Sequence, residues 1–483
     1  MASTCDKSFA SNYLLVNSKE ATFLDLFKIL FSSDVGKRKF VDVPDGVRLS
    51  IDRRWIILVA VLIQKILEFL SKPMAWFGSM IENFLNLLSG NNGFFGLLRN
   101  FFRGKIVYPD KTSASFVSFI GHCDKRRELD SNIEYGDSRY YAALSMMACK
   151  ASYENHNYIQ TIVEDDWKNK LIKSLHLSTD YQEKANTQAC VLTDNKNVTI
   201  VAFRGTETYS ADDWSTDFDI SWYELPGVGK IHAGFMKALG LQKSQGWPKN
   251  QADGKPVTAY YALRKLLKEK LQNNDKARFI VTGHSLGGAL ASLLPAVLSL
   301  HDESWLLDRL EAVYTFGQPR VGDETFAQYM ETTFKNNYIS YYRCVYSFDL
   351  VPRVPLDDST FMFKHFGTKN CIYFNSFYTG QVLAEEPNKN YFDVKYLLPK
   401  YANAAWELVR SFTISCTRGA DYKESGLLRI FRLFGLIIPG IPPHLLQDYV
   451  NSTRLVSSDV FVTNVYSIDD MEMEKLSIMI VGK

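Results

Sequence analysis

The sequence predicts an α/β fold with a mostly parallel central sheet, preceded by an N-terminal segment of hydrophobic and amphipathic helices. The first observation is a short apolar, β-branched run at residues 279–281, followed by a sharp turn and an apolar helical run to residue 300. The second is a pair of further short apolar strands at residues 312–316 and 341–346. With 483 residues and 46% hydrophobic content, the chain has room for one large domain plus an appended segment.

The overall charge and the cysteine pattern exclude several classes of protein. The net charge of +2 is too balanced for a protein whose main partner is nucleic acid. The seven cysteines are scattered, and none forms a Cys-x-x-Cys pair or a Cys/His cluster, so we expect no metal site. Their odd number indicates reduced thiols and a cytosolic setting. The first 20 residues lack the long apolar stretch of a secretory signal.

The N-terminal region, residues 1–54, is mixed in composition and predicts only modest structure. The next block, residues 55–104, contains the unbroken apolar run WIILVAVLI at 55–63 and a second apolar stretch at 74–88. Polar residues recur in both stretches at helical spacing, which argues against a transmembrane span. We expect Pro73 to break the block into a hairpin of two amphipathic helices that lies in a lipid–water interface. The alternative is a pair of core helices packed on the main domain.

Residues 105–132 are predicted to form a connector, and the main domain is expected at 133–483. Residues 140–153 carry Ala, Leu and Met at helical spacing and predict a packed helix. Two apolar runs at 189–193 and 198–203, separated by Asp-Asn-Lys-Asn, predict a β-hairpin. An amphipathic helix at 260–271 leads to the central strand.

The turn after the central strand carries Ser285 between Gly283 and Gly287. A serine at a strained strand-to-helix turn, with flanking glycines that let strand and helix approach closely, resembles the nucleophile elbow of α/β-hydrolases. The alternative is an ordinary serine in a glycine-rich turn. The strand before the motif and the small-residue helix after it favour the elbow.

A serine nucleophile needs a base, and the base needs an orienting carboxylate. In this fold the chain order is serine, acid, histidine. Asp349 follows directly after a predicted strand, which places it at the catalytic edge of the sheet, whereas its competitors lie farther from a strand end. His444 lies in a proline-rich loop that can present an imidazole, and we prefer it to His365, which falls inside a probable strand. The competing acids are Asp323, Asp357 and Asp358.

Acyl transfer also requires two donors aimed at the developing oxyanion. We assign them to Leu286, the residue after the nucleophile, and to Thr206, which follows a glycine at the mouth of a buried strand. Residues 209–225 are acidic on one side and aromatic on the other, as expected of an interfacial lid. An ordinary surface helix is the alternative. This chemistry needs no metal and no cofactor.

Four motifs carry a resemblance to a known family. They are FRGT at 203–206, GHSLGGA at 283–289, FGQPRVG at 316–322 and DLVPRVP at 349–355. In this order, across about residues 133–450, they resemble the class 3 lipase family. The resemblance implies Ser285 as nucleophile, Asp349 as acid and His444 as base, with the oxyanion hole and lid as assigned above.

The apolar N-terminal block and an insertion at about residues 375–440 resemble the plant oil-body lipases most closely. This implies a triacylglycerol lipase on the cytosolic surface of lipid droplets, with the endoplasmic reticulum membrane as a further location. A phospholipase or galactolipase of the A1 type would use the same residues, and a catalytically inactive signalling scaffold is the alternative from another class. The insertion has three open interpretations: a second interfacial element, a dimer contact of a homo-oligomer, or a wall of the acyl tunnel.

Overall fold

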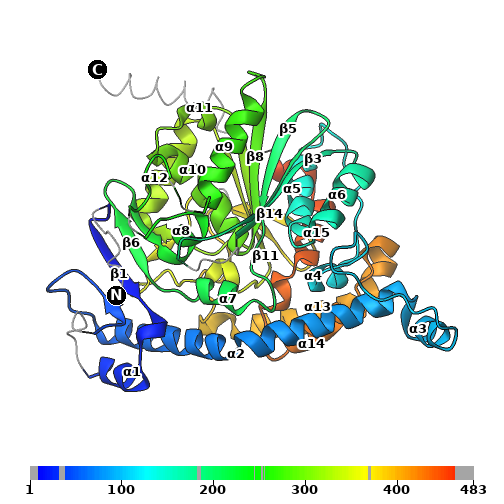
Figure 1. The fold of residues 1–483 in the computed structure, drawn as a ribbon, viewed down its shortest axis with the longest axis horizontal. Coiled ribbons are helices and arrows are strands. Elements are labelled where there is room, and N and C mark those ends of the chain that lie inside the picture. Colours follow the sequence, from blue (N-terminus) through cyan, green and yellow to red (C-terminus); the bar gives the residue numbers. More distant parts are fainter. Residues whose placement is uncertain are drawn as a thin grey trace.

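A mixed, mostly parallel sheet forms the centre of the molecule (Figure 1). The computed structural model describes residues 9–31, 38–181, 187–243, 245–251, 254, 256–367 and 371–462. The eight strands have the order β14-β13-β11-β9-β8-β5-β4-β3. Their bounds are β3 (Lys170–Leu177), β4 (Thr187–Thr193), β5 (Val198–Phe203), β8 (Arg278–His284), β9 (Leu310–Phe316), β11 (Ser340–Tyr346), β13 (Cys371–Phe374) and β14 (Gly380–Leu383). Strands β5, β8, β9, β11 and β13 run parallel, and β3, β4 and β14 are antiparallel to their neighbours. The predicted α/β-hydrolase fold class, the hairpin and the central strand are confirmed.

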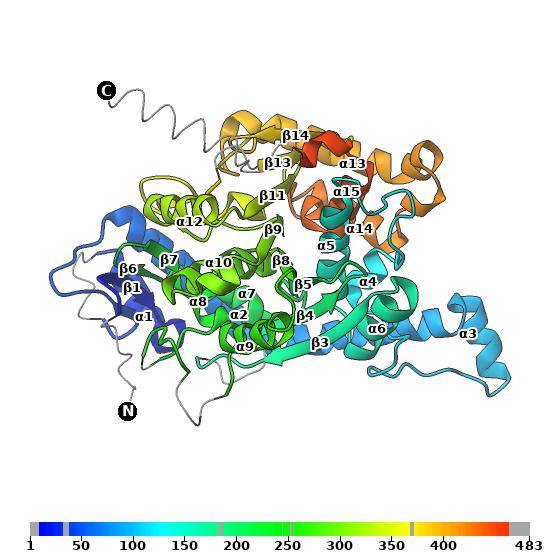
Figure 2. The same cartoon turned by 90° about the horizontal axis from the view of Figure 1, so that it is seen from above.

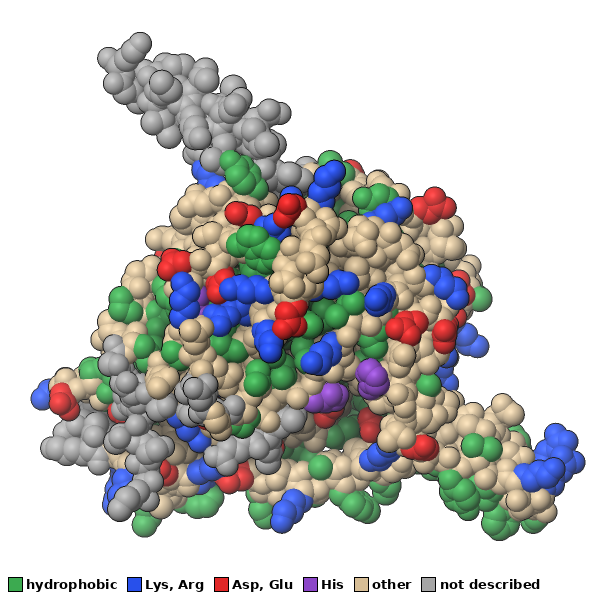
Figure 3. All heavy atoms as spheres, turned by 45° about the horizontal axis from the view of Figure 1, so that its top comes forward, with side chains coloured by type: hydrophobic (Ala, Val, Ile, Leu, Met, Phe, Trp, Pro, Cys, Tyr) green, Lys and Arg blue, Asp and Glu red, His purple; other side chains and the backbone are tan. Residues whose placement is uncertain are grey.

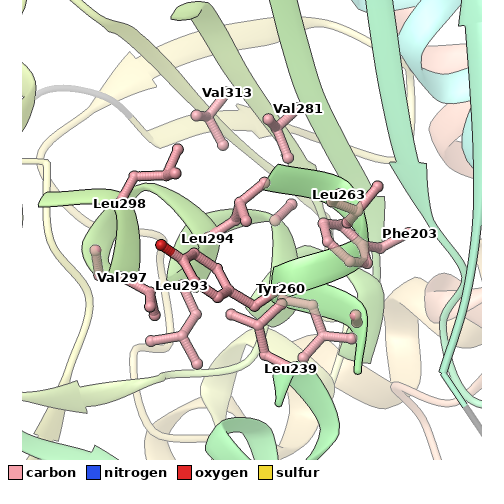
Figure 4. Packing of buried hydrophobic residues seen from close by; sticks show 14 of the residues in the cluster. Phe203, Leu239, Tyr260, Leu263, Val281, Leu293, Leu294, Val297, Leu298 and Val313 are labelled. Atoms are coloured by element: carbon pink, nitrogen blue, oxygen red, sulfur yellow. The ribbon is translucent and has the colours of Figure 1, made fainter. Parts of the chain in front are cut away.

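Helices cover both faces of this sheet, which is why its central strands are almost continuously apolar. On β5, Val201 and Phe203 join one core cluster, whereas Ile200 and Ala202 join the other. The helices of the first cluster are α8 (Ala233–Leu239), α9 (Ala259–Leu271), α10 (Leu286–Leu300) and α12 (Glu324–Asn336). Those of the second are α5 (Tyr140–Ala151), α6 (His156–Gln160) and α15 (Leu446–Leu455). The view from above shows these two layers (Figure 2), and a close-up shows Val281 and Val313 of the sheet over Leu294 of α10 (Figure 4).

The N-terminal region is better structured than its composition suggested. Strand β1 (Asn12–Val16) pairs with β6 (Trp222–Leu225), so the region completes a second, antiparallel sheet. The other strands of this sheet are β2 (Val41–Asp42), β7 (Gly229–His232), β10 (Gly322–Asp323) and β12 (Phe363–Lys364). Helices η1 (Ser18–Glu20) and α1 (Phe23–Ile29) follow β1. A small core that includes Leu26, Phe40 and Ile57 joins this region to the next helix.

One helix, α2 (Ile51–Gly90), runs through Pro73 without interruption, so the predicted break at Pro73 is wrong. Proline removes one backbone hydrogen bond and costs a helix interior about 3 kcal/mol. Contacts on both sides of Pro73 offset that cost. Ile57 is buried in the N-terminal core, Gln64 donates to the Ser215 carbonyl (3.3 Å), and Asn86 both donates to and accepts from the Val117 backbone. The chain turns instead at residues 91–92, before α3 (Gly93–Phe102).

The remaining elements connect the layers or lie in the predicted insertion. The predicted connector contains α4 (Phe119–Cys123), and the predicted insertion contains the long helix α13 (Leu397–Arg418) and the shorter α14 (Gly426–Gly435). The predicted lid contains α7 (Ala211–Asp217). Short elements are η2 (Thr161–Asp166), α11 (Ser304–Leu307), η3 (Val351–Arg353), η4 (Val394–Tyr396), η5 (Ala420–Tyr422), η6 (Pro442–His444) and η7 (Ser458–Phe461). Among the described residues, no helix is both long enough and apolar enough to cross a membrane.

Candidate active site

Ser285 occupies the sharp turn between β8 and α10. Its backbone adopts φ 58° and ψ −130°, a region that non-glycine residues rarely enter. The Ser285 amide donates to the Phe316 carbonyl of the neighbouring strand (2.9 Å), which fixes the turn against the sheet. A Cβ on Gly287 would overlap the Phe203 carbonyl oxygen, so only glycine lets the new helix start this close to β5. The turn has the geometry of a nucleophile elbow.

The structure brings the three predicted triad side chains together. His444 Nε2 lies 2.8 Å from Ser285 Oγ, and His444 Nδ1 lies 2.8 Å from Asp349 Oδ2. Because a carboxylate only accepts, Nδ1 carries the proton and Nε2 accepts from the serine hydroxyl. Asp349 is fully buried, whereas 17% of the His444 side chain is exposed to solvent. This hydrogen-bonded chain can remove a proton from Ser285 Oγ and store the resulting charge.

Asp349 is held by two further groups that the sequence reasoning missed. The hydroxyl of Tyr449, on α15, donates to Asp349 Oδ2 (2.5 Å), and the Val351 amide donates to Oδ1 (2.9 Å). Tyr449 follows His444 by only five residues, but nothing in that spacing identified it as a partner of the acid. These bonds orient the carboxylate toward the imidazole.

The competing residues have other roles. His365 is buried, its Nε2 lies 2.7 Å from the Pro352 carbonyl, and burial followed by the charge of Arg343 holds its pKa well below 6.5. Asp323 caps the N-terminus of α12, Asp358 accepts from the backbone of its own turn, and Asp357 pairs with Lys389. None of these contacts the Ser285 hydroxyl.

His284, immediately before the nucleophile, forms a second connection to the base. Its Nε2 donates to the backbone carbonyl of His444 (2.9 Å), and its Nδ1 accepts from the Tyr153 hydroxyl (3.1 Å). The two imidazole rings stack with centroids 4.6 Å apart. Burial, and then the neighbouring His444, hold the pKa of His284 well below 6.5, so this ring stays neutral. Its position inside the serine motif was the only sequence signal for it.

The two predicted oxyanion residues flank Ser285. Leu286 is the first residue of α10, and Thr206 follows β5 in a loop pressed against the turn. A Cβ on Gly205 would lie 3.1 Å from Ser285 Cβ and 2.5 Å from the His284 carbonyl oxygen, so this approach requires glycine. The Thr206 hydroxyl donates to Asp217 Oδ2 at the end of α7 (2.7 Å). Backbone amides at a helix start and in a neighbouring loop are groups of the kind that stabilise a developing oxyanion.

The predicted lid lies between this loop and α2. Asp213 of α7 accepts from the Glu207 amide (3.0 Å) and lies 3.4 Å from the Arg204 guanidinium, so α7 is tied to the Thr206 loop. Burial raises the pKa of Asp217 from 3.8 to about 7. A cavity of about 460 Å³ is lined by residues of α2, of α4 and of the segment 207–212. Within the described residues, no cluster of three or more His, Cys, Asp or Glu side chains could hold a metal ion.

Comparisons with known proteins agree on one family. Residues 200–359 match the family model described as Lipase (class 3). The chain is 41% identical to Triacylglycerol lipase OBL1 of Arabidopsis thaliana, over 92% of this chain and 95% of that protein. It is 39% identical to Triacylglycerol lipase OBL1 of Nicotiana tabacum, over 84% of each. A solved fungal lipase–inhibitor complex is 25% identical over 50% of this chain and 79% of that one, with a TM-score of 0.36. The chain belongs to the class 3 lipase family.

Proposed function

We propose that this protein is a triacylglycerol lipase that hydrolyses neutral lipid at an oil–water interface with Ser285, His444 and Asp349 as its catalytic triad. The observation that carries the chemistry is the unbroken hydrogen-bonded chain from Ser285 Oγ through the His444 ring to Asp349, with both distances 2.8 Å. The substrate class rests on the names of the two plant relatives, which are similar to this chain over most of its length.

The reaction follows from the roles that the geometry permits. Ser285 Oγ attacks the ester carbonyl while His444 Nε2 takes its proton. His444 then returns this proton to the departing diacylglycerol, and Asp349 stabilises the imidazolium. Water then attacks the acyl-enzyme while the same nitrogen takes its proton, and His444 gives that proton to Ser285 Oγ as the bond to the acyl group breaks and the fatty acid leaves. All proton transfers use side chains of this chain, and no cofactor takes part.

Backbone amides of Thr206 and Leu286 stabilise the oxyanion in both steps. One such donor is typically worth two to three orders of magnitude in kcat, or about 3–4 kcal/mol. The Thr206–Asp217 hydrogen bond links this loop to α7, so movement of the lid at residues 209–225 and formation of the oxyanion hole are coupled. In this proposal, an apolar substrate that enters from a lipid phase displaces α7 from α2.

The site of action is the surface of lipid droplets, or oil bodies, facing the cytosol, and the endoplasmic reticulum membrane is a further location. Residues 55–104, which include most of α2 and all of α3, attach the enzyme there. Many of their large apolar side chains are exposed, among them Phe69, Trp76 and Phe95. Such side chains on an amphipathic helix bind a lipid interface.

Purified protein tested on triolein emulsions and on phosphatidylcholine vesicles decides the substrate class. We expect faster release of fatty acid from triolein, and loss of all ester hydrolysis in Ser285→Ala. Dominant cleavage of the phospholipid would instead identify a phospholipase of the A1 type. Activity retained by Ser285→Ala would remove this serine from the mechanism, and a wild-type protein inert on every ester would indicate a non-catalytic scaffold.

A further inference from the structure

The two insertion helices, α13 and α14, expose their apolar sides and bury their charged sides. Leu398 on α13 is 81% exposed and Ile437, just after α14, is 69% exposed. The exposed apolar side chains of this pair are Leu397, Leu398, Tyr401, Trp406, Val409, Phe412, Ile430, Leu433, Phe434, Leu436, Ile437, Ile438 and Ile441. A helix pair on a water-exposed surface has the opposite arrangement, with charges outward and apolar groups inward.

A buried ionic cluster holds the pair in this orientation. Arg432 of α14 is 1% exposed and binds Glu424 (2.8 Å), Asp448 (2.9 Å) and Glu407 (3.1 Å). Arg410 of α13 binds Asp448 of α15 (2.8 Å). Breaking one of these pairs would leave an uncompensated buried charge, at a cost of about 3–5 kcal/mol. The helices therefore cannot roll over to bury their apolar sides, and the outward apolar surface is a permanent feature of the fold.

A chain of aromatic contacts, which passes through the buried Phe119, connects α14 to α2. Phe77 of α2 contacts Tyr209, and Tyr209 contacts Phe119 of α4, with ring centroids 6.1 and 5.2 Å apart. Phe119 in turn contacts Phe431 of α14 at 5.7 Å. Figure 1 shows α2, α3, α13 and α14 along one edge of the molecule, and Figure 2 shows them spread across its width. We call the exposed apolar side chains of these four helices the apolar floor.

Basic side chains lie at the ends of the apolar floor. Residues 93–109 contain Arg99, Arg103 and Lys105, all exposed, and no acidic residue. Near the other helix pair, Arg418 and Lys423 are exposed; of the acidic residues beside them, Asp421 is exposed, whereas Glu424 is buried against Arg432. Figure 3 shows blue side chains beside the green ones on the protruding end formed by α3. Phospholipid phosphates complement this charge, whereas a second copy of the chain would bring like charges together.

We propose that α13 and α14 are a second lipid-contacting element, which binds the phospholipid monolayer of a neutral-lipid droplet at the same time as α2 and α3. This inference rests on the proposed function for the identity of the droplet, and it selects one of the three interpretations of the insertion. Two rigid attachment regions on one surface bind together more tightly than either alone. They also fix the orientation of the enzyme, so that α7, which packs on α2, faces the lipid.

Flotation with artificial droplets, made of a triolein core and a monolayer of phosphatidylcholine and phosphatidylserine, tests the proposal with the full chain. Leu433→Ser/Ile437→Ser on the α14 segment and Leu398→Ser/Phe412→Ser on α13 should each weaken droplet binding roughly tenfold, since each removes two large apolar contacts. Phe69→Ser/Trp76→Ser on α2 should have a similar effect. Val257→Ser/Tyr338→Ser, which changes two exposed side chains in loops before α9 and after α12, should bind like the wild type.

Hydrolysis of a soluble short-chain ester, measured on the same variants, should stay within twofold of the wild type. Wild-type droplet binding by both insertion variants would overturn the proposal. A dimer that dissociates in those variants, seen by light scattering, would show that a second copy covers the surface. Insertion variants that bind droplets normally but lose soluble-ester hydrolysis would indicate that α13 and α14 form a wall of the acyl tunnel. A wild-type protein that floats but hydrolyses no ester would refute the proposed function and leave the docking surface standing.

Discussion

Asp349 receives hydrogen bonds on both oxygens, and one of its two partners on Oδ2 is the Tyr449 hydroxyl. A carboxylate held this way keeps the His444 ring in the orientation that points Nε2 at Ser285. The Tyr449 hydroxyl bonds the Asp349 carboxylate and accepts from the Tyr346 amide. In the proposed mechanism, Tyr449 is a positioning residue that acts through Asp349.

Tyr449→Phe should lower kcat for a soluble ester roughly tenfold with little change in KM, because a hydrogen bond to a charged group is lost at a site that binds no substrate. Steady-state kinetics on a short-chain ester measure both constants. Tyr342→Phe is the matched control, since the Tyr342 hydroxyl bonds the Phe461 carbonyl (3.4 Å) rather than a side chain of the proposed triad. Equal kcat values for the two variants would argue against the positioning role.

Asp217 gives the stability of the protein a pH dependence. Its pKa is raised from 3.8 to about 7, chiefly by burial, so the folded protein retains this proton across a range where the unfolded chain has lost it. The free energy of unfolding therefore falls as pH rises from about 4 to about 7. Asp217→Asn removes the titration and keeps an oxygen that accepts from Thr206. Relative to the wild type, its melting temperature should rise between pH 5 and pH 8, whereas Asp165→Asn, at an exposed carboxylate, should show no such trend.

At the scale of elements, one asparagine joins α3 to the end of α2. The Asn91 side chain is fully buried and donates to the carbonyls of Leu87 (2.8 Å) and Val107 (2.7 Å). Its oxygen accepts from the Val107 amide (3.0 Å) and from the Asn100 side chain (2.9 Å). Among the described residues of α2 and α3, no other side-chain amide makes as many hydrogen bonds as Asn91. We infer that Asn91 sets the angle between these two helices.

Asn91→Ala should loosen α3 without affecting catalysis. We expect faster hydrogen exchange in residues 93–107, corresponding to a local loss of about 1–3 kcal/mol, because backbone groups lose their buried partners. Hydrolysis of a soluble ester should be unchanged, since α3 lies away from Ser285. Ser89→Ala, at an exposed position two residues earlier, provides the control. Unchanged exchange in Asn91→Ala would show that other contacts hold α3.

At the scale of the whole molecule, the ionic cluster around Arg432 connects the predicted insertion to the loop that carries His444. Asp448 belongs to α15, which begins two residues after His444, and it binds guanidinium groups from both insertion helices. The neighbouring residue, Tyr449, binds Asp349. The insertion therefore supports the position of the histidine as well as forming part of the apolar floor.

Arg432→Gln should destabilise the protein by about 3–5 kcal/mol, because three buried carboxylates lose their shared cation. Thermal unfolding should show a lower melting temperature, and kcat on a soluble ester should fall with it. Arg429→Gln on the same helix should have a small effect, since Arg429 is only half-buried and its hydrogen bonds go to the Ser411 carbonyl. Equal melting temperatures for the two variants would mean that the cluster contributes no stability.

The sequence by itself determined the features of this molecule that depend on short-range patterns. The fold class, the turn at Ser285 and the order of serine, acid and histidine follow from short-range patterns and from chain topology, which is why Asp349 and His444 could be selected before their contact was visible. The class 3 lipase family was recognisable from four motifs for the same reason.

Tertiary contacts alone decided the rest. Pro73 lies within a continuous helix because packing on both sides outweighs one lost hydrogen bond. The partners Tyr449, His284 and Asp217 depend on side chains that meet across distant segments, and no spacing rule encodes them. Arg410 of α13 and Arg432 of α14 point inward because Asp448, on α15, pairs with both of them. A buried charge is stable only beside a counter-ion, and here the counter-ion comes from another helix.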